Sequence, residues 1–378
     1  GLLSLFSSSV VFLMPFISLG LVQSASTDFF KLDKKEFKDF FTTAFALTGL
    51  TTILSVIILF ILKDNLQIKY GFPLNFIWII PAVTFLTFCA EQITGLIRNN
   101  DQPFKYLGIG VIKITVELGI ALILITVFSY GWMGRVTGML TALFLTAGYS
   151  LYYFVKNGYL FGKVKVKYIK SELVYALPII VMQANMFIMG SSDKFFLAND
   201  HATLGIYTIA CTFASVIVIF STALIQYFFP KIFALLSSEE VNYPKIRRLF
   251  FYYFGAMLCG FLLFVLFVSL GYRLFINIRY HEALQYISFI AAGYFFWALA
   301  SIFYSFLLYY KEKRKILIHS VLCMTVAILS NYYFIKKWSA YGAGIAVMVT
   351  YFIVLVITFF VTKKYIKNIF NRSLSVKV

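Results

Sequence analysis

Hydrophobic residues run through this chain in eleven long blocks separated by short polar segments. The blocks lie near residues 2–27, 41–62, 76–97, 106–130, 136–155, 173–192, 202–229, 249–270, 284–308, 316–335 and 340–362. Each is about 20 residues or longer, the length that an α-helix needs to cross roughly 30 Å of hydrocarbon. No ten-residue alternation of apolar and polar positions is visible, which favours helices over barrel strands. The pattern predicts an all-α integral membrane protein with about eleven transmembrane helices.

The composition agrees with this prediction and gives an orientation. Of the 378 residues, 61% are hydrophobic and only 13% are charged, more apolar than a water-soluble domain of this size allows. The net charge of +18 comes mostly from short loops, so membrane orientation explains it better than nucleic-acid binding. Counted over alternate loops, one set holds 24 of the Lys and Arg residues and the opposite set 8. The richer set includes the tail from Lys363, so the C-terminus is predicted to be cytoplasmic.

A weak internal repeat predicts two lobes around a central cavity. Residues 130–140 and 339–348 both open a span on the outer side with small residues four apart, Gly134 with Gly138 and Gly342 with Ala346. Such spacing lets helix backbones approach closely. The repeat keeps its direction across the membrane, so it is parallel.

The predicted domain organisation follows from the repeat. It comprises an N-lobe of five helices (1–155), a basic cytoplasmic loop (156–172), a C-lobe of six helices (173–362) and a basic cytoplasmic tail (363–378). Because the lobes differ by one helix, a helix belonging before Gly1 is expected to be missing from this sequence.

Three motifs resemble a known family. They are A-L-P-I-I…S-S-D-K-F-F-L…L-G-I-Y-T-I-A within 176–210, R-N-N-D-Q-P at 98–103 and G-A-G-I-A-V at 342–347. In this order and spacing the chain resembles Wzx-like oligosaccharide flippases, polysaccharide-biosynthesis proteins of the multidrug/oligosaccharidyl-lipid/polysaccharide exporter superfamily. The first motif contains five residues for which a structural role is expected: Pro178, Asp193, Lys194, Gly205 and Tyr207.

The resemblance implies a function, a location and partners. It implies alternating-access transfer of undecaprenyl-pyrophosphate-linked oligosaccharides to the outer leaflet of the bacterial inner membrane, for O-antigen, capsule or exopolysaccharide synthesis. The implied partners are the lipid-linked oligosaccharide, membrane lipids, and possible contacts with a polysaccharide polymerase and other export components. No cofactor and no nucleic acid is implied.

Ionisable residues inside the spans are the candidates for substrate binding, because a charge in the membrane normally faces protein or water. Lys113 and Glu117 lie four apart and hence on one helix face. In a transport role Lys113 would meet a diphosphate, and Glu117 would neutralise it in the empty site. A purely structural ion pair explains the same spacing equally well.

The positions of other polar residues within the spans predict further roles in binding or packing. Glu91 is a candidate proton or sodium site, and a hydrogen-bonded structural carboxyl explains its position equally well. Arg98 is expected to be an interfacial anchor that could also contact the substrate. Of Gln183 and Asn185, which are two apart, one could line a cavity. Three others are expected to form interhelical hydrogen bonds: Gln226, His319 and Asn331.

Two other functions remain open. A drug or cation antiporter with the same fold would need an acidic cavity, in which Glu91 outweighs Lys113. A membrane enzyme acting on lipid-linked sugars is disfavoured, because the loops are short and lack a D-x-D pair or paired carboxylates. The four Cys and three His residues are scattered without metal-binding spacing, so neither a metal site nor a catalytic site is predicted.

Overall fold

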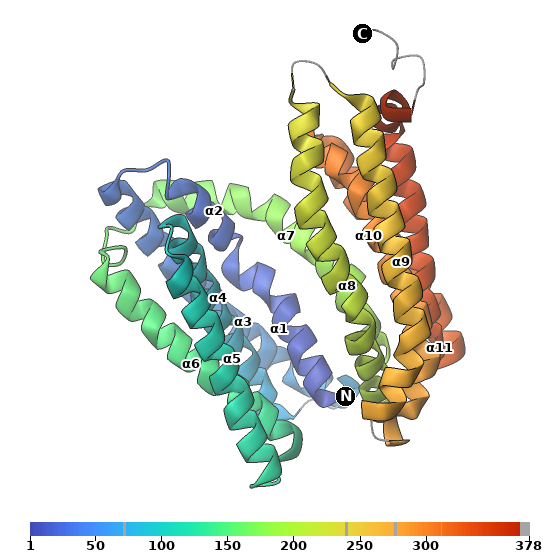
Figure 1. Cartoon of the computed structure of the whole chain (residues 1–378). Coiled ribbons are helices and arrows are strands. Elements are labelled where there is room, and N and C mark those ends of the chain that lie inside the picture. Colours follow the sequence, from blue (N-terminus) through green and yellow to red (C-terminus); the bar gives the residue numbers. More distant parts are fainter. Residues whose placement is uncertain (71–72, 239–240, 276–277, 311, 371–378) are drawn as a thin grey trace. The chain divides into compact units, whose positions relative to one another are not determined.

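The computed structural model describes residues 1–70, 73–238, 241–275, 278–310 and 312–370, and within them every regular element is a helix (Figure 1). The first half contains α1 (Leu2–Ser18), α2 (Leu21–Asp28), α3 (Lys34–Tyr70), α4 (Leu74–Asn99), α5 (Pro103–Thr126) and α6 (Gly131–Lys156). The rest contains α7 (Val166–Phe196), α8 (His201–Leu236), α9 (Tyr243–Phe275), the short 3₁₀ helix η1 (Ile278–Ala283), α10 (Leu284–Tyr309) and α11 (Lys313–Phe370). The predicted all-α fold class is confirmed.

Eight helices in the described residues are long and apolar enough to span a membrane. One of them, Arg314–Lys367, has 54 residues, about 80 Å of helix and far more than one crossing needs. Its backbone leaves the helical region at Trp338 and Ser339, so α11 consists of two helices joined by a tight turn. We call residues 313–337 the first half of α11 and residues 340–370 its second half. They correspond to the last two predicted spans.

The other predicted spans also lie mainly on helices. The first is divided between α1 and α2, because Leu19 and Gly20 adopt positive φ values of 50° and 73°. A Cβ atom at Gly20 would come within 2.6 Å of the Ile179 side chain, so this break needs glycine for space as well as for conformation. The sixth predicted span, 173–192, lies within α7. Together these elements make the chain a multi-pass membrane protein.

The chain divides into two compact units. The N-terminal unit comprises Leu2–Phe187, and the C-terminal unit comprises Ile188–Val378 together with Gly1. The sequence analysis placed the division at the 156–172 loop, whereas the contacts divide the chain inside α7. Each unit is described separately below.

The 156–172 segment belongs to the N-terminal unit because it is fastened to α3. The Lys165 ammonium lies 2.7 Å from the Asp39 carboxylate, and the Lys163 backbone N–H donates to the same carboxylate at 2.7 Å. Gly162 donates to the Thr42 hydroxyl at 2.9 Å. The hydrogen bond to Asp39 raises the pKa of Lys165, so the pair remains charged at neutral pH.

Aromatic packing completes this attachment. Phe37, Phe40 and Phe41 of α3 are buried against Phe154 of α6 and Tyr168 at the start of α7. The Phe40 and Tyr168 rings meet edge to face with centroids 5.7 Å apart, a favourable geometry for aromatic pairs. The segment that is predicted to be a basic cytoplasmic loop therefore contributes Tyr159, Leu160 and Tyr168 to an aromatic core.

In the C-terminal unit, α10 occupies the centre, since both its N-terminal and C-terminal turns contribute fully buried residues. Gly293 of α10 leaves room for Val347 in the second half of α11, whose side chain would lie 2.8 Å from an added Cβ atom. The Tyr253 hydroxyl of α9 donates to the Ala298 carbonyl at 2.7 Å. These contacts tie α9 and α11 to α10.

The small residues of the internal repeat lie at close helix contacts in both units. A Cβ atom at Gly138 of α6 would lie 2.5 Å from the Glu117 carbonyl oxygen of α5. One at Gly342 would collide with the Phe334 carbonyl across the turn in α11, and Ala346 is fully buried. The α5–α6 pair and the two halves of α11 are thus equivalent hairpins, as the repeat predicts.

Candidate functional site

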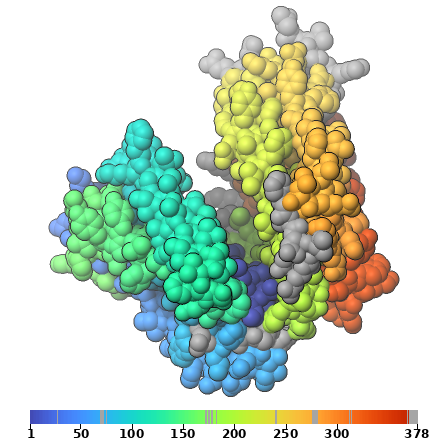
Figure 2. Space-filling view, turned by 60° about the horizontal axis from the view of Figure 1, so that its bottom comes forward, coloured from blue at the N-terminus to red at the C-terminus, as the bar shows by residue number. Residues whose placement is uncertain are grey.

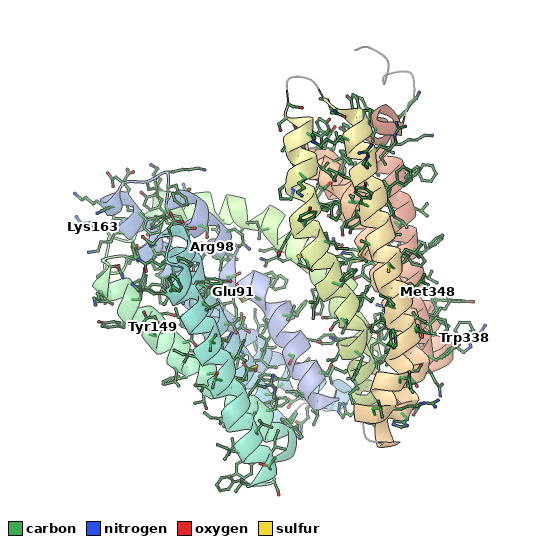
Figure 3. All side chains as sticks on the ribbon, in the orientation of Figure 1. Glu91, Arg98, Tyr149, Lys163, Trp338 and Met348 are labelled. Carbon is green, nitrogen blue, oxygen red and sulfur yellow. The ribbon has the colours of Figure 1, made fainter. Side chains whose placement is uncertain are left out.

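The predicted ionisable residues of the N-terminal unit lie on α4 and α5. Glu91 and Arg98 are both exposed on α4, and Arg98 is in its last turn. Figure 3 places Arg98 towards the same end of the unit as Lys163, with Glu91 nearer the middle. That position fits the anchoring role expected of Arg98, since the polar segments fastened to α3 lie at this end.

Glu117 has a different partner from the expected one. Its carboxylate lies 2.9 Å from the Arg135 guanidinium of α6, although Lys113 is one turn away on the same helix. Arg135 belongs to the second turn of α6. The close approach of α5 and α6 at Gly138 brings Arg135 to Glu117, so Lys113 is left without this counter-charge.

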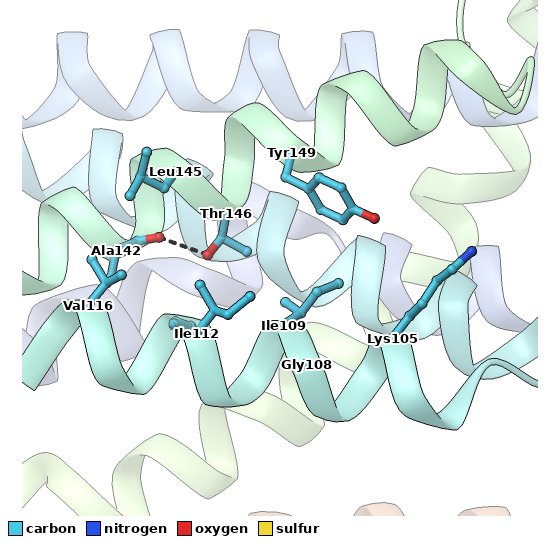
Figure 4. A pocket seen from close by; sticks show the side chains of 10 residues that line it. Lys105, Gly108, Ile109, Ile112, Val116, Ala142, Leu145, Thr146 and Tyr149 are labelled. Atoms are coloured by element: carbon cyan, nitrogen blue, oxygen red, sulfur yellow. Dashed lines mark hydrogen bonds between the residues drawn. The ribbon is translucent and has the colours of Figure 1, made fainter.

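Lys113 lines a groove of about 420 Å³ between α5 and α6 (Figure 4). Its ammonium is close enough to Glu91 of α4 to act electrostatically on that carboxylate, but no ion pair within 4 Å joins Lys113 to any described residue. The groove residues are Lys105, Gly108, Ile109, Ile112, Lys113 and Val116 of α5, and Ala142, Leu145, Thr146 and Tyr149 of α6. The sequence analysis missed Lys105 here because its position near the helix start reads as a loop charge.

The polar candidates on α7 have unsatisfied groups. The side-chain oxygens of Gln183 and Asn185 are buried and have no hydrogen-bond partner among the described residues. Each can accept two hydrogen bonds, so either could bind a donor. Pro178 also lies on α7, but its side chain is outside the described part of the structure.

Asp193, near the end of α7, is the best-organised polar residue of the C-terminal unit. It is buried and accepts a short hydrogen bond from the Tyr207 hydroxyl of α8. The Lys194 backbone N–H donates to its other oxygen at 2.9 Å, whereas the Lys194 side chain is half-buried. Gly205, also half-buried, lies two residues before Tyr207 on α8. The family motif thus brings together an acid and a tyrosine fourteen residues apart.

More tyrosines and a thiol surround Asp193. Tyr294 and Tyr351 are close enough to interact with it electrostatically, as is Cys211. The Tyr351 hydroxyl donates to the Met189 carbonyl of α7 at 3.2 Å. The sequence analysis missed these residues because tyrosines in apolar helices give no distinguishing pattern.

Two of the three expected interhelical hydrogen bonds form. Asn331 donates to the Ser192 hydroxyl at 2.9 Å, and His319 Nε2 lies 2.8 Å from the Thr358 hydroxyl. Gln226, in contrast, is exposed on α8. Asp200 caps α8 by accepting from the Ala202 and Thr203 backbone N–H groups at 3.0 and 3.1 Å. Within the described residues, no group of three potential metal ligands is present.

Comparisons with known proteins support the fold. No protein-family model and no curated protein matches the chain. An inward-facing multidrug resistance MATE family transporter of the MOP superfamily has 14% identity and a TM-score of 0.74, with 99% of this chain and 92% of the other covered. A MOP superfamily transporter from Pyrococcus furiosus, described as having a binding pocket of reverse polarity that suggests a different function, has 13% identity, a TM-score of 0.58 and coverages of 98% and 86%.

A mutant of the Vibrio cholerae MATE transporter VcmN is a third match, with 13% identity, a TM-score of 0.56 and coverages of 97% and 86%. All three are transporters, and at these identities the likeness establishes the fold. The chain therefore has the helical fold of MOP superfamily transporters, the superfamily to which the sequence motifs pointed. The finer resemblance to oligosaccharide flippases is not among these matches.

Proposed function

We propose that this protein is a secondary transporter that exports an organic solute, such as a drug or an organic cation, in exchange for a cation. The observation that carries the proposal is the near full-length match to a multidrug resistance transporter. This favours the antiporter alternative of the sequence analysis over the flippase interpretation. Antiport also requires a group in the membrane that loads and releases the exchanged cation.

Asp193 supplies such a group. An ionisable side chain within a membrane protein is costly and is usually retained for function. The Tyr207 hydroxyl and the Lys194 backbone N–H occupy two acceptor positions of the carboxylate, which has about four. The remaining positions can accept a proton or a sodium ion, and Glu91 offers a second, exposed carboxylate on α4.

The test is gradient-driven dye transport by the purified full chain in proteoliposomes. We expect efflux of a cationic dye driven by a sodium or pH gradient, and its loss in Asp193→Asn. Asp200→Asn is the matched control, because an exposed asparagine keeps the α8 cap and leaves transport unchanged. Folded protein that moves no cationic dye under either gradient would contradict the proposal.

The second candidate is the lipid-linked oligosaccharide flippase, and the groove with Lys105 and Lys113 favours it. An anionic diphosphate would be attracted by these lysines, and the Pyrococcus furiosus relative is described as having a pocket of reverse polarity within the same fold. Outward movement of the anion would gain about 2.3 kcal/mol per charge per 100 mV of inside-negative potential. A polysaccharide polymerase and other export components would then be partners.

Lys113→Ala separates the two candidates. A flippase should lose surface-polysaccharide export in this variant while the protein is still made, whereas a dye antiporter should be unaffected. We also propose that the chain lies in the bacterial inner membrane with a cytoplasmic C-terminus, as the distribution of Lys and Arg in the loops predicts. Reporter fusions near Gly162 and Asn199 test the orientation: we expect Gly162 inside and Asn199 outside, and an extracellular signal at Gly162 would reject it.

A further inference from the structure

The α5–α6 groove combines two lysines with an apolar floor. Lys105 and Lys113 are eight residues apart on α5, about 12 Å along the helix axis. Between and beyond them the surface is formed by Ile112 and Val116 of α5 and Leu145 of α6. The outer surface of α5, teal in Figure 2, forms a continuous ridge on the N-terminal unit. Only 6% of the residues in the most apolar 18-residue stretch of this helix are buried.

Neither lysine forms an ion pair within 4 Å among the described residues, although Glu91 of α4 acts electrostatically on Lys113. The nearest carboxylate along α5, Glu117, is held by Arg135, and no ion pair forms with Lys105 or Lys113. Lys105 is exposed and Lys113 half-buried. A charge facing the membrane interior is costly, so an external anion at this position would stabilise both lysines. Their long flexible stems let both ammonium groups turn towards one anion between them.

The groove is also polar at one end and apolar at the other. Tyr149 of α6 and Lys105 of α5 line the same end of the groove (Figure 4), and the Thr146 hydroxyl, which donates to the Ala142 carbonyl at 2.7 Å, also lines it. Past Lys113 the lining is Val116, Ala142 and Leu145. This order matches a molecule with an anionic head and a hydrocarbon chain, and about 420 Å³ lies within the range of small-molecule sites.

We propose that this groove binds one anionic phospholipid of the surrounding membrane, with its phosphate between Lys105 and Lys113. One acyl chain runs along Ile112, Val116 and Leu145. The charge complementarity selects an anionic head group, and the open apolar floor selects a lipid over a free anion. The site does not depend on the drug-exporter proposal, whereas the flippase alternative would place the diphosphate of its cargo at the same lysines.

The experiment is native mass spectrometry of the purified full chain with phosphatidylglycerol and phosphatidylcholine. We expect wild-type protein to retain one phosphatidylglycerol in preference to phosphatidylcholine. The double variant Lys105→Ala/Lys113→Ala should bind phosphatidylglycerol about tenfold more weakly, because each lysine near a lipid surface attracts the anionic head group. Lys156→Ala is the matched control, since Lys156 is exposed on α6 outside the groove and bonds to Tyr152. It should retain the lipid as wild type does.

A second variant tests whether the apolar floor of the groove binds the acyl chain of the lipid. Leu145→Trp fills the floor without altering charge, and it should also reduce phosphatidylglycerol retention. Leu145 is 55% exposed, so the variant should fold, and its thermal unfolding is the check. Unchanged retention in the double lysine variant would overturn the site. So would equal competition by inorganic phosphate, or displacement of phosphatidylglycerol by polyprenyl phosphate, which would make the groove a cargo site. None of these results bears on gradient-driven dye transport, so the two proposals fail separately.

Discussion

The α5–α6 pair and the two halves of α11 are equivalent hairpins with different surroundings. In the C-terminal unit, the last part of α7 lies against the α11 hairpin: Met189 packs on Cys323 and Val354, and Ser192 bonds to Asn331. In the N-terminal unit, α5 and α6 form an open groove that is lined by two lysines. His319 and Asn331 of the covered hairpin are neutral and pair within the protein, whereas Lys105 and Lys113 of the open groove are cations.

Solvation explains the difference. A buried polar group must find its hydrogen bonds within the protein, and His319 and Asn331 do so. A lysine has three donors and a charge, which a neutral helix cannot satisfy, so it is tolerated only where an anion or water can reach it. The predictions that follow test how far this contrast determines stability and binding.

The largest effect on stability is expected at the glycines where the two helices of each hairpin approach closely, Gly138 and Gly342. Gly138→Ala would place a Cβ atom 2.5 Å from the Glu117 carbonyl oxygen, so α5 and α6 must separate. Overpacking of this kind costs about 1–3 kcal/mol and should lower the unfolding temperature in detergent. Gly148→Ala is the control, because nothing lies within 4 Å of its Cβ position. Equal unfolding temperatures for the two variants would show that the helices are not in contact there.

The second prediction contrasts the covered and open hairpins directly. Asn331→Leu removes a buried hydrogen bond to Ser192 and should destabilise the protein by about 1 kcal/mol. Lys113→Leu removes a charge from an apolar groove and should leave the unfolding temperature in detergent unchanged or raise it. Thermal unfolding measures both. If Lys113→Leu destabilised the protein as much as Asn331→Leu, Lys113 would have an internal partner and the contrast would fail.

A smaller effect is expected from the Glu117–Arg135 ion pair, which forms instead of the predicted Lys113–Glu117 pair. Arg135→Ala removes the partner of Glu117 on a half-exposed surface, which should cost up to about 1 kcal/mol. A double-mutant cycle of Arg135→Ala with Glu117→Gln isolates the interaction energy of this pair. A second cycle, of Lys113→Ala with Glu117→Gln, measures the interaction energy of the pair predicted from the sequence. A larger coupling for Lys113 than for Arg135 would restore the pairing expected from the sequence.

The smallest effect is expected at Asp200, in the turn between α7 and α8. Hydrogen bonds from the Thr203 hydroxyl and backbone N–H hold the pKa of Asp200 below the ordinary aspartate value of 3.8. Because the folded pKa is the lower one, this stabilisation is present above pH 3.8 and is lost as the pH falls through the folded pKa. Asp200→Ala should therefore cost about 0.5 kcal/mol at neutral pH. The difference from wild type should shrink below pH 3.8 in thermal unfolding, and a constant difference down to pH 2 would argue against the cap.

The amino-acid sequence by itself determined the properties that depend on neighbours along the chain. The hydrophobic blocks gave the spans, and the small residues at Gly138 and Gly342 indicated close helix contacts. Asp200 stands directly before the apolar block at 202–229, and aspartate is a favoured cap there, because capping is local to the first turn of a helix. These features follow from hydrogen bonding and solvation of a single segment, so no knowledge of its neighbours is needed.

Only the tertiary structure decided which side chains meet. Glu117 has Lys113 on its own helix, yet it pairs with Arg135, because the contact at Gly138 sets the rotation of α6 against α5. Asp193 meets Tyr207 across a turn, and the 156–172 segment joins the N-terminal unit through Asp39. Each outcome depends on which helices are neighbours and how each is turned about its axis, and packing between segments far apart in the sequence fixes both.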